Sequence, residues 1–130
     1  ECRRWIRQPW KLRDSYINVI LNQTEGRRLL DQFSSKVIPS RDAARLLLLL
    51  EAQRRRLAMY ASDGWFFDDL SRLEVRANLS HAALAIELTS RATGIDLMPD
   101  LRSDLATAKS WLTDETGRDV LDRVVRERQI

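Results

Sequence analysis

Three aromatic residues and two carboxylates stand together in the segment YASDGWFFDD, near the middle of the chain. Trp65, Phe66 and Phe67 are consecutive. Asp68 and Asp69 follow at once. Neighbouring residues of a helix or strand point in different directions, so three consecutive rings cannot all face one core. We expect part of the cluster to face outward, where it suits a carbohydrate: an indole stacks on a sugar ring while carboxylates accept hydrogen bonds from its hydroxyls.

Each member of this cluster has a structural alternative. We expect Trp65 to face outward, whereas Phe66 or Phe67 fills the core, because a corner between two helices needs an apolar plug. Asp68 and Asp69 can instead cap the N-terminus of the next helix. Paired carboxylates also serve as acid and base in glycoside hydrolysis. Adjacent positions at a helix start diverge in direction, however, so this pair is poorly placed to straddle a glycosidic bond.

The other chemistry-bearing residues favour structural roles. His81 is the only histidine and Cys2 the only cysteine, which disfavours a zinc site, and we expect no metal and no cofactor. We interpret His81 as a half-buried residue with one hydrogen bond. The run Arg54 to Arg56 can contact phosphates, but nearby acidic residues weaken its positive field. We interpret it as a solvated helix face and expect no nucleic-acid partner.

Length and composition indicate one helical domain. The chain has 130 residues, enough for a single compact domain covering 1–130. Its apolar fraction of 44% and charged fraction of 32% suit helices with one buried face. The longest apolar run, Leu46 to Leu50, is too short for a membrane span, so we expect no membrane partner. The single cysteine and the lack of a signal segment favour a cytoplasmic location.

Proline and glycine divide the chain into helical segments. Ser40 is expected to cap the third helix, Gly64 to end it, and Gly94 to end the fourth. Thr24 and Thr113 are the expected caps of the second and last helices. The sequence therefore predicts an all-α fold, a compact bundle of five or six helices. The expected ranges are about 10–22, 25–37, 41–63, 69–93, 100–111 and 113–125.

The stretch LLLLLEAQRRRLAMYASDGWFFDDLSRLE resembles the helical C-terminal domain named domain of unknown function 3536. Two shorter segments, from Pro9 to Ile17 and from Ala108 to Val120, resemble flanking motifs of that family, so the resemblance covers most of the chain. The chain departs from the family pattern at three positions, where Arg55, Asp63 and Trp111 replace His, Cys and Asn. The matching residues are Leu50, Glu51, Gln53, Arg54, Leu57, Met59, Tyr60, Ser62, Gly64, Trp65, Phe66, Phe67, Asp68 and Glu74.

The resemblance implies a domain that follows a glycoside hydrolase family 57-like barrel in bacterial proteins. The chain would then be a C-terminal fragment of an α-glucan-active glycoside hydrolase or glucanotransferase, without catalytic residues of its own. It would pack on the catalytic barrel and line the sugar cleft. The expected substrate-binding residues are Trp65, Asp68, Asp63 and Tyr60. The expected structural or docking residues are Gln53, Arg54, Phe66, Phe67 and Glu74.

A second interpretation belongs to a different functional class. The chain can be a stand-alone helical interaction module whose exposed aromatic corner binds another protein. A docking face of this kind would also allow dimerisation.

Overall fold

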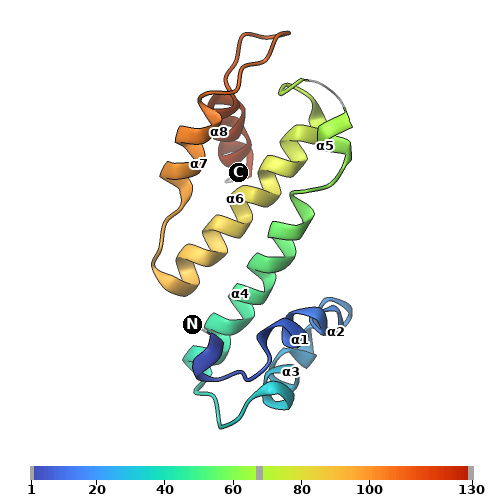
Figure 1. The fold of residues 1–130 in the computed structure, drawn as a ribbon, viewed down its shortest axis with the longest axis vertical. Helices are drawn as coiled ribbons and strands as arrows, with labels where there is room; N and C mark the ends of the chain where they lie inside the picture. Colours follow the sequence, from blue (N-terminus) through green and yellow to red (C-terminus); the bar gives the residue numbers. More distant parts are fainter. Residues whose placement is uncertain (1, 67–68, 129–130) are drawn as a thin grey trace. The chain divides into compact units, whose positions relative to one another are not determined.

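A computed structural model describes residues 2–66 and 69–128 of the chain. Within these residues the chain forms eight α-helices and two short 3-10 helices, and no strand (Figure 1). Six of the α-helices have six or more residues. The predicted all-α fold is confirmed. The chain divides into two compact units, Glu1–Glu51 and Ala52–Ile130, which are described separately below.

Unit 1 consists of short helices and the first part of a long one. Its elements are η1 (Cys2–Arg4), α1 (Pro9–Asp14), α2 (Ile17–Leu21), η2 (Gln23–Glu25), α3 (Gly26–Phe33) and the start of α4 (Ser40–Ala58). The prediction of one unbroken helix over 10–22 is wrong. The N–H of Tyr16 turns back to the carbonyl of Arg13, 3.1 Å away, and this tight turn separates α1 from α2. The expected cap of the second helix at Thr24 is wrong, because the N-cap residue of α3 is Glu25 and Thr24 lies in η2, which the side chain of Asn22 caps.

The core of unit 1 is built from aliphatic side chains of several elements. Ile6, Leu12, Leu30 and Ile38 are all fully buried. They join Leu46 and its neighbours on α4 in one hydrophobic cluster. Burial of this apolar surface is the main force that gathers such short helices, because helices of five to eight residues are marginal in isolation.

Unit 2 is organised around one long helix. Its elements are the end of α4, then α5 (Asp63–Phe66), α6 (Leu73–Thr93), α7 (Met98–Leu105) and α8 (Gly117–Arg128). Helix α6 packs against α5 and α8, and α7 packs against α8 (Figure 1). Ala82 and Ala83 of α6 are buried, as are Val120, Leu121 and Val124 of α8. Among the described residues, no helix is long and apolar enough to cross a membrane.

One of two predicted helix limits in unit 2, the end of α6 and the start of α8, agrees with the structure. Gly94 follows α6 with a left-handed φ of 79°, and its N–H donates to the carbonyl of Ser90, so the predicted stop is confirmed. The expected cap of the last helix at Thr113 is wrong. Thr116 caps α8 instead: its hydroxyl accepts from the N–H of Asp119, and its own N–H donates to the Asp119 carboxylate.

Gly64 has a different role from the predicted one. Helix α4 ends at Ala58, and Gly64 lies inside α5. A Cβ atom at this position would overlap the side-chain amide of Asn78 on α6. That amide donates a hydrogen bond of 3.0 Å to the carbonyl of Ala61. Glycine at this position therefore leaves room for the Asn78 amide in its bond to Ala61, and it does not end a helix.

Gly64→Ala should lower the free energy of unfolding by about 1–3 kcal/mol, because the added methyl group displaces the Asn78 amide from the Ala61 carbonyl. Urea unfolding measures the loss. Asn78→Ala and the double variant complete a mutant cycle. We expect the double variant to lose less stability than the sum of the single losses, since removing Asn78 also removes the overlap. Additive losses would contradict this role of Gly64.

Candidate functional site

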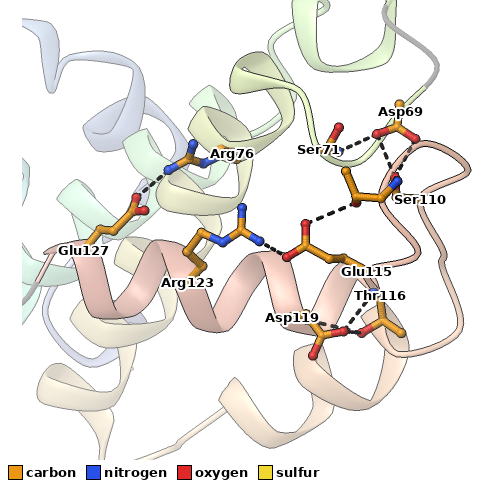
Figure 2. A network of polar contacts seen from close by, with 10 residues as sticks. Asp69, Ser71, Arg76, Ser110, Glu115, Thr116, Asp119, Arg123 and Glu127 are labelled. Carbon is orange, nitrogen blue, oxygen red and sulfur yellow. Dashed lines mark hydrogen bonds and ion pairs between the residues drawn. The ribbon is translucent and has the colours of Figure 1, made fainter.

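A buried carboxylate joins two distant segments of unit 2. Asp69 lies in the turn before α6 and is 5% exposed, and Ser110 lies in the loop between α7 and α8 and is 2% exposed. The Ser110 hydroxyl donates to this carboxylate, with its oxygen 2.8 and 3.0 Å from the two carboxylate oxygens. The backbone N–H groups of Ser71 and Trp111 also donate to it, at 2.7 and 3.1 Å. We call this arrangement the Asp69 clasp (Figure 2).

The clasp also orders the α7–α8 loop from within. The Ser110 hydroxyl oxygen accepts from the N–H groups of Leu112 and Thr113, at 3.1 and 3.0 Å. The Ser110 N–H donates to the carbonyl of Glu115, 2.8 Å away. The side chain of Glu115 in turn pairs with Arg123 of α8 (Figure 2). The loop is thus fixed to the turn before α6 and to α8.

Asp69 carries a negative charge at neutral pH. Burial alone would raise the pKa of Asp69, because a carboxylate loses hydration inside a protein. Hydrogen bonds from Ser71, Ser110 and Trp111 outweigh that effect and hold its pKa well below the ordinary value of 3.8. Such a carboxylate is a poor general acid, and its oxygens are engaged in fixing the loop. Asp69 is not a helix N-cap either, because α6 begins at Leu73 after the cap residue Arg72.

The depressed pKa gives the stability of unit 2 a defined acid dependence. The contribution of Asp69 is fully present above its unfolded pKa, near 3.8, and is lost as the pH falls toward the lower folded value. We therefore expect Asp69→Asn to lower the melting temperature by several degrees at pH 7. The side-chain N–H₂ group of asparagine cannot accept hydrogen bonds, so some of the N–H and O–H groups that now donate to Asp69 would lose their acceptor.

The difference between wild type and variant should shrink as the pH falls from about 5 to about 2, because the unfolded wild-type chain then binds a proton at Asp69 whereas the folded chain keeps this carboxylate ionised. Thermal unfolding followed by circular dichroism measures both curves. Asp104→Asn, at an exposed carboxylate of α7, is the matched control. A difference that is constant across this range would contradict the low folded pKa.

A groove of about 520 Å³ opens beside the clasp. Met59 and Tyr60 border it from the end of α4 and the residues that follow, Gly64 from α5, and Asp69 from the turn before α6. Most of its lining is apolar, as in typical small-molecule and peptide sites. The remaining lining residues are Leu70, Val75, Asn78, Leu79, Ala82, Leu101, Leu105 and Ala108.

The expected substrate-binding residues do not all border this groove. Tyr60 borders it and is 57% exposed. Asp63 is the exposed first residue of α5, and Trp65 lies within the same helix. Asp68 lies outside the described residues. Asp69, which we expected to cap a helix or to act beside Asp68, is the carboxylate that the groove contains.

The aromatic pair expected to supply a core plug is described only in part. Phe66 is 80% exposed, so it does not fill the core, and Phe67 lies outside the described residues. Helix α5 turns Gly64 toward Asn78 of α6. Phe66 is two residues further along, which is about 200° of rotation, so its side chain points away from that contact.

The expected docking residues do not border the groove. Gln53 and Arg54 are half-buried on α4. Glu74 is half-buried in the first turn of α6, with its carboxylate 3.7 Å from the guanidinium of Arg72. Their proximity in the sequence motif therefore does not translate into one shared site with Tyr60 and Asp69.

His81 is half-buried on α6, as interpreted from the sequence. A guanidinium nitrogen of Arg55 lies 3.5 Å from its Nδ1 atom. Burial, then the charges of Arg55 and Arg54, lower the pKa of His81 below 6.5. Because arginine only donates hydrogen bonds, the ring is neutral with Nδ1 as acceptor. No group of three or more His, Cys, Asp or Glu in the described part of the chain could hold a metal ion.

Comparison with known families identifies the chain. A sequence model of the family described as a domain of unknown function, number 3536, matches residues 1–130. The chain belongs to this family. No curated protein matches it, and no solved structure does.

In this domain of unknown function 3536, sequence reasoning missed the roles of Ser110 and Trp111. The signal available was the segment from Ala108 to Val120, which resembles a family motif although it contains no residue pattern typical of a binding site. The structure gives that segment a physical role, because it contains the loop that Asp69 holds. The partnership joins residues 41 positions apart, so no local periodicity could indicate it.

Proposed function

We propose that this chain is a non-catalytic helical accessory domain of a family 57-like α-glucan-active glycoside hydrolase or glucanotransferase. It would pack on the catalytic barrel of a larger bacterial, cytoplasmic protein and line one side of the sugar cleft. The observation that carries the proposal is the groove beside the clasp, whose border includes the motif residues Met59, Tyr60 and Gly64. These residues belong to the stretch by which the chain resembles domains that accompany such barrels.

Exposed aromatic rings at this end of unit 2 support a sugar-facing surface. Tyr60 borders the groove, and Phe66 belongs to the adjoining helix α5. We assign the stacking role to Trp65, also in α5, because tryptophan offers the largest ring face to the C–H groups of a sugar. Asp63, at the exposed start of α5, is the carboxylate proposed to accept sugar hydroxyls, together with Asp68.

The carboxylate chemistry supports an accessory role over a catalytic one. Asp69 is buried, ionised and hydrogen-bonded to three neighbouring residues, so it cannot donate a proton to a leaving group at neutral pH. In this proposal hydrolysis or transfer is the task of the barrel. Gln53, Arg54 and Glu74 are assigned to the docking of that barrel or to the support of α5.

The proposal predicts weak α-glucan binding by the chain, since the barrel supplies the other half of the cleft. Titration with maltoheptaose should change tryptophan fluorescence, and Trp65→Ala should weaken the binding and reduce the change. Trp10→Ala is the matched control, because Trp10 is an exposed tryptophan of unit 1. In the full-length enzyme, Trp65→Ala should lower kcat/KM about tenfold, equivalent to ~1.4 kcal/mol of lost transition-state binding.

Two results would contradict the cleft role. The first is a fluorescence titration whose amplitude and midpoint are the same in Trp65→Ala as in the wild type. The second is a full-length Trp65→Ala enzyme whose kcat/KM equals that of the wild type. Circular dichroism of the variants establishes that the helices are intact in both comparisons.

The apolar lining of the groove favours one alternative, a helical module that binds another protein. Leu79, Leu101 and Leu105 offer apolar surface that suits a hydrophobic side chain better than a sugar hydroxyl. Such a module would not respond to maltoheptaose. It would instead show a partner-dependent or self-associating species in sedimentation, and Tyr60→Ala would weaken that association.

A further inference from the structure

Trp111 is an exposed aromatic side chain on a tightly held backbone. Its side chain lies in the α7–α8 loop and is 72% exposed. Its N–H donates to a carboxylate oxygen of Asp69 at 3.1 Å, and Ser110 immediately before it is almost completely buried. The clasp therefore fixes the backbone of a residue whose large ring remains accessible.

The exposure of Trp111 is informative because most of its ring surface is left accessible to a ligand. Burial of an aromatic ring stabilises a protein, whereas an exposed ring leaves its apolar faces in water. Preorganised aromatic residues bind partners well, since little conformational entropy remains to be lost on association. The hydrogen bonds of Ser110 to Asp69, Leu112 and Thr113 supply that preorganisation.

The clasp also connects the backbone of Trp111 to a residue that borders the groove. Asp69 borders the groove and accepts the N–H of Trp111, so the backbone of Trp111 lies one hydrogen bond from a groove residue. Tyr60, in the turn that follows α4, borders the same groove. Tyr60 thus borders the groove, and the backbone of Trp111 is bonded to a second residue of its border.

We propose that Trp111 is a second aromatic contact of the α-glucan surface, and that Asp69 and Ser110 are its positioning residues. This inference rests on the proposed function and adds to it a preference for chain length. A short oligosaccharide contacts the part of the surface near Tyr60, and a longer one also reaches Trp111. Trp111 then contributes to the binding of long α-glucans and little to that of maltose.

The test follows backbone and indole signals of the 130-residue chain by two-dimensional NMR during titration with maltose and with maltoheptaose. Trp111→Ala should weaken maltoheptaose binding about tenfold and leave maltose binding within a factor of two of the wild type. Trp10→Ala, the exposed control in unit 1, should change neither. Asp69→Asn should broaden or shift the indole signal of Trp111 and weaken maltoheptaose binding.

The outcomes separate this inference from the proposed function. If the wild-type chain binds maltoheptaose and Trp111→Ala binds it equally well, the role of Trp111 is overturned and the accessory function stands. Equal losses for maltose and maltoheptaose overturn the length preference. If the wild-type chain shows no shift with either sugar, the proposed function fails and this inference fails with it.

Discussion

The architecture of unit 2 depends on one buried, charged hydrogen-bond centre. The turn before α6 and the loop before α8 are both irregular, and their backbone N–H groups need partners wherever water is excluded. The Asp69 carboxylate accepts from both segments, and the Ser110 hydroxyl passes that interaction on to Leu112 and Thr113. One anion thus replaces the hydrogen bonds that a regular helix would have supplied. Charge-assisted bonds of this kind are stronger than neutral ones.

The sequence predicts the helices well and their junctions poorly. Gly94 ends α6 as expected, because a left-handed C-cap is a local property that glycine alone satisfies cheaply. Gly64 is misleading for the opposite reason, because the constraint on it is not local. A Cβ atom at this position would overlap Asn78, which lies on another helix, 14 positions later in the chain. Thr113 and Thr116 are equally good caps by residue type, and only the fold of the α7–α8 loop selects Thr116.

In the candidate site, too, the sequence indicated local features and missed contacts between distant segments. Tyr60 was recognisable from the aromatic segment and does border the groove. The sequence indicated that Asp69 is one of two adjacent carboxylates. It did not indicate that Asp69 is buried and holds a loop, because its partner Ser110 is remote in the sequence. Trp111 was recognisable only as a departure from the family pattern, in which Asn stands at this position. Membership of the family called domain of unknown function 3536 now connects these segments, and the clasp gives a physical reason for their joint presence in one chain.

Amide hydrogen exchange tests the clasp most directly. We predict slow exchange at the N–H groups of Ser71, Trp111, Leu112 and Thr113 in the wild-type chain, and a concerted loss of that protection in Asp69→Asn. Amides within α8, such as that of Val124, should keep their protection in the variant. Fast exchange of the four loop amides in the wild type, or unchanged protection in Asp69→Asn, would contradict the account.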